Sequence, residues 1–583
     1  MEYPTLNVKQ KSRQMSDAFL GYNHNLRIGD NEFYDMKNMT SDYYPVLAPR
    51  QKRGLYKDGI NATGLIAKDK LCYVDGSAFV IGTERIEMGL SDSPKELISM
   101  GAYVIIMPDR KYINTVETSD SGDIDATFTS TGDVTFTMCT LTGEEYKNEN
   151  GKAIYQGETA PSDPVNGELW IDTSSTPHTL KKYSTAQGQW VSIATTYIKI
   201  SSTGIGANFK QYDGVKISGI EGDLEELNKY HVLWDCGDDY LIIIGMLDNV
   251  TTQKSGAITV SRKMPDMDFI VESNNRLWGC KYGKNDDGDV VNEIYACKLG
   301  DFKNWNCYME ISTDSYTVSC GTDGPFTGAI THLGYPLFFK ETCVHKVYGD
   351  YPANFRLQNT ACRGVQKGSH RSLAIVNETL YYKAANAVCA YDGSLPVEMS
   401  SVLGEIRYSD AVASAHGNKY YIDMKTADGT YHLFVFDTAK GMWHKEDNIH
   451  VDCLCSYMNE MYGIDHDTKS IITLFGTGTQ DSKKIPWMVE TGLVGMSLPD
   501  MKYISRLLIR MSLAVGTKVE ISIQYDSIGD WEQVCQMTAT SLRSFAVPVR
   551  PRRCDHFRIR IEGEGESRIY SITKTIEQGS DVS

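Results

Sequence analysis

Two short segments carry residue types that could hold a metal ion. Residues 285–289 read Asn-Asp-Asp-Gly-Asp and residues 465–467 read Asp-His-Asp. Clustered oxygen atoms of this kind suit Ca²⁺. The first segment lacks the downstream glutamate of a helix–loop–helix calcium site, and Asn, Asp and Gly are also the residues that a hairpin turn requires. We therefore expect turns at both places and predict no metal site.

No catalytic motif stands out. The chain contains no GxSxG, no HExxH and no phosphate-binding glycine-rich motif. The 12 histidines are isolated, and His345, His432 and His466 each lie beside a predicted strand, where we expect structural roles. A glycosidase would need paired carboxylates, but the sequence selects no pair from its 75 acidic residues. We expect neither enzymatic activity nor a cofactor.

Three aromatic residues are the best candidates for a recognition surface. Trp170, Tyr183 and Trp190 lie on short predicted strands, and such rings could stack on sugar rings. A small module also needs large apolar side chains for its own core. Both interpretations remain open from the sequence.

Basic residues gather in two places. One cluster is Arg50, Lys52 and Arg53, and the other contains Arg552 and Arg553. We expect these five residues to contact another subunit or a partner.

Composition narrows the class of protein. The net charge is −17 and the pI is about 5.2, which argues against a protein that holds nucleic acid tightly. The 14 cysteines include no CxxC pair, so we expect buried, reduced thiols and folding in a reducing cytoplasm. The opening residues are polar and the apolar runs are short, so we expect neither a signal peptide nor a membrane span.

The elements that must position these residues are β-strands. The chain has 35 Tyr and 50 Gly, which favour half-buried strands joined by tight turns. Residues 419–445 show the clearest unit: a strand, a hairpin, a second strand ending at Asp437 and a turn ending at Trp443. Similar units recur at roughly 40–50 residues, as in the blades of a β-propeller. A series of β-sandwiches is the alternative.

We therefore predict an all-β protein with a β-propeller-like core, an inserted small β module and a C-terminal β-sandwich or jelly-roll domain. The propeller is assigned residues 56–120 and 222–475, the inserted module 121–221 and the sandwich 476–583. Residues 1–55 are predicted to form an extended arm that wraps over other surfaces. A strand that closes the propeller ring is the alternative for this segment.

Three segments resemble structural proteins of tailed-bacteriophage tails. Residues 23–54 resemble the opening of propeller-containing nozzle and head-completion (DNA-stabilisation) proteins. Residues 160–191 resemble a small Trp-containing module of phage tail proteins, and residues 550–572 resemble the closing β-domain of phage structural proteins. Together they cover roughly a third of the chain.

The resemblance implies a non-enzymatic virion protein of the tail, a nozzle, hub or adaptor ring around the DNA channel. It would fold in the host cytoplasm and assemble as a ring of six. Its partners would be copies of itself, the portal, an adaptor or tail fibres, and DNA would pass without sequence-specific binding. An acidic channel would let that DNA slide.

Two other functions remain open. The protein could be a receptor-binding tail protein that contacts a host surface glycan through the inserted module. It could also be a propeller glycoside hydrolase, although no residue pair points to one.

Overall fold

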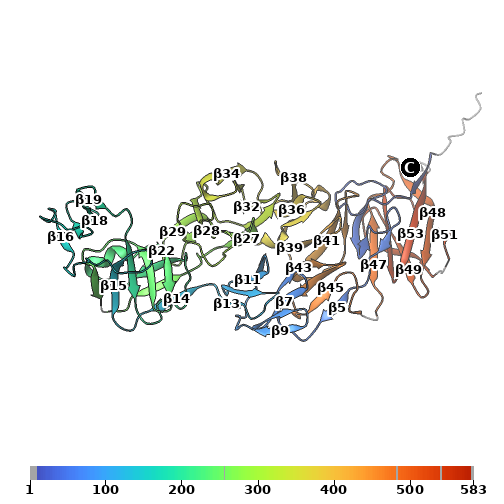
Figure 1. Cartoon of the computed structure of the whole chain (residues 1–583). Helices are drawn as coiled ribbons and strands as arrows, with labels where there is room; N and C mark the ends of the chain where they lie inside the picture. Colours follow the sequence, from blue (N-terminus) through green and yellow to red (C-terminus); the bar gives the residue numbers. More distant parts are fainter. Residues whose placement is uncertain (1–9, 255, 481–482, 539–540, 580–583) are drawn as a thin grey trace, which may run out of the picture.

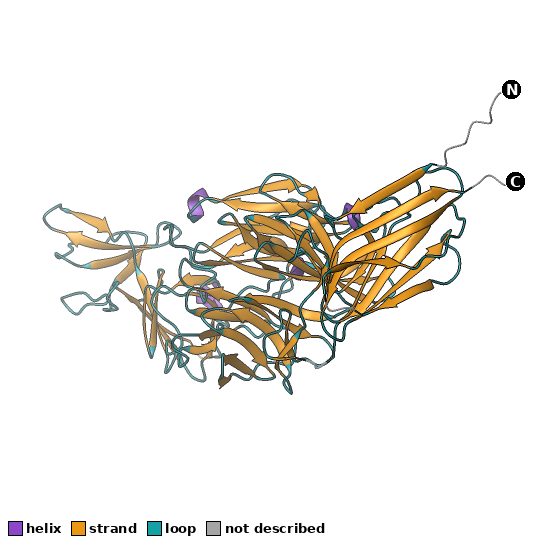
Figure 2. Cartoon of the chain, turned by 90° about the vertical axis from the view of Figure 1, so that its right-hand side faces the viewer, coloured by secondary structure: helices purple, strands orange, loops and turns teal. Residues whose placement is uncertain are grey.

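In the computed structural model the chain is elongated and built almost wholly from β-strands (Figures 1 and 2). The structure describes residues 10–254, 256–480, 483–538 and 541–579. An inserted domain lies at one end, a β-propeller in the middle and a β-sandwich at the other end (Figure 1).

Seven sheets of the described chain form the propeller blades. Blade 1 consists of β6 (Ala62–Ala67), β7 (Leu71–Asp75), β8 (Ala78–Ile81) and β9 (Glu84–Glu87). Blade 2 consists of β10 (Glu96–Met100), β11 (Tyr103–Met107), β12 (Lys111–Asn114) and β13 (Ser121–Asp123). Blade 3 consists of β27 (Phe269–Ser273), β28 (Arg276–Lys284), β29 (Val290–Ala296) and β30 (Tyr316–Ser319). Blade 4 consists of β31 (Gly328–His332), β32 (Tyr335–Lys340), β33 (Cys343–Tyr348) and β34 (Arg356–Ala361). Blade 5 consists of β35 (Ala374–Val376), β36 (Thr379–Ala384), β37 (Ala387–Tyr391) and β38 (Val397–Glu398). Blade 6 consists of β39 (Tyr408–His416), β40 (Lys419–Thr426), β41 (Tyr431–Asp437) and β42 (Met442–Lys445). Blade 7 has five strands: β43 (Val451–Tyr457), β44 (Glu460–Asp465), β45 (Ile471–Thr473), β5 (Gly54–Lys57) and β46 (Thr479–Gln480).

Each blade is held by apolar side chains on both of its faces. In β40, Ile422 and Met424 join one hydrophobic core, whereas Tyr421 joins the core on the opposite face. Successive side chains of a strand point to opposite faces, so a blade between two neighbours must be apolar at nearly every position. The predicted unit 419–445 is therefore confirmed as strands β40 to β42 of blade 6.

The ring is closed by the N-terminal segment. The short strand β5 pairs with β45, so blade 7 combines residues from both ends of the propeller sequence. The innermost strands β6 and β43 also contact each other, which joins blade 7 to blade 1. The alternative prediction, a closing strand, describes residues 54–57 correctly.

The centre of the ring is crossed by a loop between blades 4 and 5. This loop carries the 3-10 helix η3 (His370–Ser372). The His370 Nε2 atom lies 2.6 Å from a Glu96 carboxylate oxygen of blade 2. The Arg371 guanidinium donates hydrogen bonds to the main-chain oxygens of Asp452 in blade 7 and of Lys95 beside blade 2. The loop therefore ties together blades on different sides of the ring.

The inserted domain lies between blades 2 and 3. One sheet contains β14 (Ala126–Thr129), β21 (Gly214–Ser218), β22 (Tyr230–Val232) and β26 (Thr259–Arg262); a second contains β15 (Val134–Cys139), β20 (Tyr197–Ser201), β23 (Asp235–Gly237), β24 (Tyr240–Ile244) and β25 (Thr251–Lys254). A third sheet, placed between β15 and β20 in the sequence, contains β16 (Tyr155–Gly157), β17 (Leu169–Asp172), β18 (Thr179–Ser184) and β19 (Gln189–Ser192).

The predicted boundaries of the insertion are wrong at its C-terminal side. The sequence assigns residues 230–262 to the propeller, but strands β22 to β26 in this range pair with strands of the inserted domain. The propeller resumes only at β27. Strands of both domains share one local pattern, so the pairing partner alone decides the domain.

The C-terminal domain is a sandwich of two antiparallel sheets. The first contains β1 (Lys11–Ser16), β48 (Lys502–Leu513), β51 (Arg543–Val547) and β53 (Ser567–Gln578). The second contains β2 (Phe33–Lys37), β47 (Pro486–Thr491), β49 (Lys518–Tyr525), β50 (Glu532–Met537) and β52 (Phe557–Glu564). A short ladder joins β3 (Met39–Thr40) to β4 (Ala48–Pro49).

The predicted extended arm is instead part of this sandwich. Strands β1 and β2 pair with β53 and β47 of the same chain. Phe19, Tyr22 and Phe33 are buried in a core that continues into blade 6. Residues 1–9 of the predicted arm lie outside the described residues.

Helix is confined to short 3-10 turns in the described chain: η1 (Gly222–Leu227), η2 (Pro352–Asn354), η3 and η4 (Ser401–Leu403). Among the described residues, no helix has the length and apolar character needed to cross a membrane.

Candidate functional site

The best candidate site is the outer face of the sheet β16–β19. This sheet lies at the tip of the molecule farthest from the sandwich (Figure 1). One face carries Leu169, Ile171 and Leu180, which are buried in the core of the inserted domain. Because side chains alternate along a strand, Trp170 and Lys181, which are paired across β17 and β18, lie on the opposite face.

Three aromatic rings meet on that opposite face, which we call the aromatic face. It is formed by Tyr155, Trp170, Lys181, Tyr183 and Trp190. The Trp190 ring lies 5.4 Å from the Trp170 ring and 5.4 Å from the Tyr183 ring, both in edge-to-face geometry. Tyr183 and Trp190 are direct cross-strand partners in β18 and β19. The hairpin register therefore brings together residues that the sequence had only grouped in one segment.

The rings are fixed in place by polar contacts. The Trp170 indole Nε1 donates a hydrogen bond of 2.9 Å to the Gly157 carbonyl. The Lys181 ammonium lies 5.0 Å from the centre of the Trp170 ring and 2.7 Å from Asp172. Hydrogen bonds from Lys181 and Ser174 lower the pKa of Asp172 to about 2, so this carboxylate stays ionised. A cation beside an aromatic ring adds electrostatic attraction to the packing.

The three predicted residues are not equally exposed on the aromatic face. Trp170 is only 5% exposed and supports Trp190 from below, whereas Tyr183 and Trp190 are half-buried. The module's aliphatic core lies on the other face, so the aromatic residues are not its main core. Tyr155 is the residue that sequence reasoning missed: it is 48% exposed and lies opposite Trp170 in β16. Its position in a short strand before the ELWID segment was the available signal.

The N-terminal basic cluster is engaged within the chain. Arg50 and Arg53 form ion pairs with Glu446 and Asp447, which follow blade 6. Their side chains are only 10% and 14% exposed. The folded arm therefore places Arg50 and Arg53 in ion pairs within the chain, and their contact with another subunit or a partner stays a prediction. Lys52 between them is half-buried.

The C-terminal basic residues remain on the surface. Arg552 and Arg553 are exposed in the segment before β52. Arg552 pairs with Glu532 and lies 5.0 Å from the Tyr525 ring. Because both residues are exposed, this prediction stays open.

The two acidic segments behave differently. Residues 285–289 form the turn between β28 and β29, where Asn285 accepts a hydrogen bond from the Asp289 amide. Asp286 and Asp287 are ion-paired to Arg110 and Lys216. In the second segment, His466 is not isolated: its ring stacks on His450 and contacts Asp452. Sequence reasoning missed this group because its members lie at the ends of two strands, β43 and β44, that only the fold brings together.

A hydrolase site at the centre of the propeller stays an open alternative. The Arg371 loop occupies this region, and Glu96 is paired with His370. Paired carboxylates free to act as acid and base are the signature of such a site.

Comparison with known proteins does not assign this chain to a family. No protein-family model matches the chain, and no curated protein matches it. Among solved structures, BamB from Moraxella catarrhalis is 12% identical over 54% of this chain and 84% of its own, with a TM-score of 0.23. A Phanerochaete chrysosporium exo-β-1,3-galactanase is 8% identical over 52% of this chain and 94% of its own (TM-score 0.21). Trypanosoma rangeli sialidase is 9% identical over 91% of this chain and 96% of its own (TM-score 0.20). Likenesses this weak carry no argument about function.

Proposed function

We propose that this chain is a non-enzymatic structural protein of a tailed-bacteriophage tail that binds a host surface glycan through the aromatic face. The observation that carries the binding role is the position of Tyr183 and Trp190: they lie on the outer face of a sheet whose inner face already forms the domain core. The tail role rests on the sequence resemblance of residues 23–54, 160–191 and 550–572.

The chemistry of this face suits carbohydrate. Aromatic rings present apolar surface to the C–H groups of a sugar, and a few fixed polar groups provide hydrogen bonds. Lys181 and Asp172 supply a donor and an acceptor beside the rings. Large aromatic residues are costly to expose unless they serve an interaction.

The architecture favours presentation of this face. The sandwich, which contains the first and last described strands, lies at one end of the molecule, and the aromatic face lies at the other (Figure 1). A protein fixed to a larger assembly through its sandwich would hold the aromatic face away from that assembly. The propeller between them would act as a rigid spacer.

Glycan binding is tested with the full chain and the Trp190→Ala variant. On arrays of bacterial surface polysaccharides we expect saturable binding by the wild type. In Trp190→Ala, binding to the same glycans should fall by about tenfold or more, because the ring supplies most of the apolar contact. Trp170 loses its edge-to-face neighbour in this variant, so unchanged melting must be verified.

The matched control is Trp531→Ala. Trp531 is also a half-buried tryptophan, but it packs against Arg560 in the sandwich, at the opposite end of the molecule. We expect this variant to bind glycan as the wild type does. Equal loss in both variants, or no binding to any glycan by the wild type, would contradict the proposed recognition role.

A further inference from the structure

We propose that His450, Asp452 and His466 form a binding site for a divalent transition-metal ion of the zinc class at the rim of blade 7. The site lies outside the aromatic face and does not depend on the proposed glycan binding. Imidazole nitrogen and carboxylate oxygen are the ligands that Zn²⁺ takes when it keeps one coordination position open.

Strand pairing creates the group. Strands β43 and β44 are antiparallel, and Val451 pairs with Asp465. The next residues outward, His450 and His466, therefore face each other, and the His466 amide donates a hydrogen bond to the His450 carbonyl. Asp452 lies two residues after His450, at a shift in the β43–β44 register. Such an irregularity redirects a side chain, and here Asp452 reaches His466.

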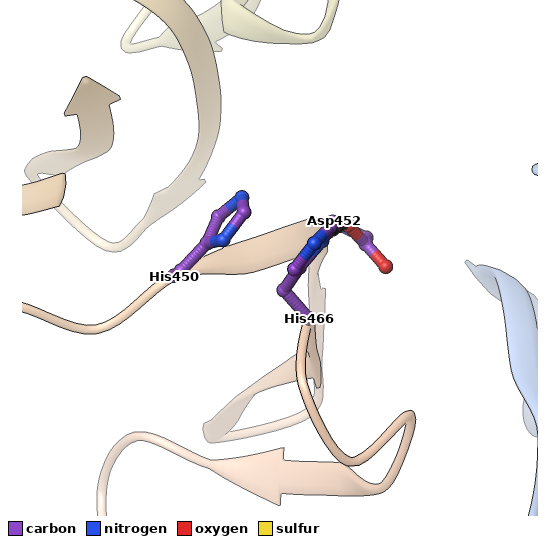
Figure 3. A group of neighbouring side chains, drawn as sticks. All are labelled: His450, Asp452 and His466. Atoms are coloured by element: carbon purple, nitrogen blue, oxygen red, sulfur yellow. Dashed lines mark hydrogen bonds and ion pairs between the residues drawn. The ribbon is translucent and has the colours of Figure 1, made fainter. Parts of the chain in front are cut away.

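The ligand atoms already lie close together (Figure 3). One nitrogen or oxygen atom from each of the three residues lies within 4.8 Å of the other two. The His466 Nδ1 atom is 2.6 Å from an Asp452 oxygen, and the two imidazole rings are stacked 3.8 Å apart. Ligand atoms on one tetrahedral Zn²⁺ are about 3.3 Å apart, as follows from bonds of about 2.0 Å. A metal ion lies in the plane of each imidazole ring that binds it, so binding requires His466, whose side chain is 44% exposed, to turn out of its stack with His450.

Surrounding groups hold the ligands ready. The Tyr431 ring stacks on the His450 ring at 3.6 Å and fixes its plane. Among the described residues, no hydrogen bond to the His450 ring is found, so its nitrogens are available. Arg371 donates a hydrogen bond to the Asp452 carbonyl and holds the main chain at this point. Support of this kind normally accompanies metal ligands.

The Lys469 ammonium would compete with a metal ion for the Asp452 carboxylate. Its ammonium lies 2.6 Å from the second oxygen of Asp452. An ion bound by Asp452 would repel this ammonium, which must then move toward solvent. We therefore expect Lys469→Met to bind the metal several-fold more tightly than the wild type.

The test is a calorimetric titration of the full chain with Zn²⁺. We expect one saturable site whose affinity falls by about tenfold or more in His450→Ala and in His466→Ala, because each removes a ligand. The matched control is His178→Ala, since His178 also pairs with a carboxylate, Asp248 at 2.6 Å, but among the described residues it belongs to no such three-residue group. Its affinity should equal that of the wild type.

Co²⁺ provides a second measurement that needs no variant. Its visible spectrum in the wild-type protein should show nitrogen and oxygen ligands without a thiolate charge-transfer band, which separates this site from the 14 free cysteines. A thiolate band at one equivalent of Co²⁺, unchanged Zn²⁺ affinity in both histidine variants, or no saturable binding by the wild type would each overturn the proposal.

Discussion

At the scale of single residues, Asp423 shows how burial changes chemistry in this fold. It lies on β40 and is only 1% exposed. One carboxylate oxygen accepts a hydrogen bond of 3.2 Å from the Val451 amide, while the other has no partner in the described chain. Burial raises the pKa of Asp423 to about 8, although Arg53 acts in the opposite direction. The carboxyl group is therefore protonated in the folded protein at neutral pH.

The pH dependence of stability follows from this shift. The unfolded-state pKa is about 3.9, so the folded protein retains a proton that the unfolded chain releases above that pH. Stability from this group is complete below about pH 4 and is lost as the pH rises through about 8. Asp423→Asn keeps the acceptor for Val451 and cannot ionise. We expect the difference in unfolding free energy between Asp423→Asn and the wild type to grow by up to a few kcal/mol between about pH 4 and about pH 8, and to stay constant above that.

Denaturant unfolding at several pH values measures this difference. Parallel pH profiles for Asp423→Asn and the wild type would show that Asp423 is already ionised in the folded protein. The assignment of a neutral carboxyl group would then be wrong.

At the scale of elements, the N-terminal segment binds the propeller to the sandwich. Strands β1 and β2 belong to the sandwich, and β5 belongs to blade 7. Between them, Arg50 and Arg53 pair with Glu446 and Asp447. Burial raises the pKa of Glu446, and the two arginines oppose that effect. The stability of a buried carboxylate of this kind depends on the cationic groups that pair with it.

We expect Arg53→Ala to destabilise the protein by about 3 kcal/mol, because it leaves Glu446 buried with less compensation. Hydrogen exchange should rise in β5 and β45, the strands that close the ring. The control is Arg85→Ala, since Arg85 pairs with Asp75 and Glu87 on the surface, with a side chain that is 45% exposed. Arg85→Ala should change stability little. Similar melting of both variants would show that the Arg53 pairs add no stability.

At the scale of the whole molecule, the inserted domain is fixed to the propeller and does not hang from a free linker. Asp213 is buried between Arg262 and Asn304, and Asn304 belongs to the segment that follows β29 of blade 3. Gly214 packs so closely there that an added Cβ would lie 2.3 Å from the Asn306 carbonyl oxygen. These contacts fix the direction in which the aromatic face points.

Assembly is the prediction that belongs to this scale. The proposed tail role implies a ring of about six copies, either alone or with a portal or adaptor partner, as closed cyclic symmetry allows. Each copy carries a net charge of −17, so the copies repel one another at low ionic strength. We therefore expect light scattering to show the ring more readily in higher salt. Since the described arm is packed on its own chain, exposed residues such as Arg552 must provide the contacts.

A stable monomer under all salt conditions, with and without such partners, would contradict the ring. The glycan-binding role would then remain as the function to test. Negative-stain images would distinguish a closed ring from open aggregates of the same mass.

The sequence by itself determined the strands and the class of fold. The alternating side chains of residues 419–445 predicted blade 6, and alternating segments within residues 476–583 predicted the sandwich, because alternation and turn residues are local properties. The aromatic segment was also visible, since Trp170, Tyr183 and Trp190 lie within a short stretch.

Only the tertiary structure decided which strands pair. It assigned β26 to the inserted domain, gave β5 to blade 7 and turned Arg53 inward. It also brought His450 and His466 together, which no local pattern shows. The physical reason is that a strand satisfies its main-chain hydrogen bonds with any compatible edge, so partners distant in sequence are chosen by the packing of the whole chain.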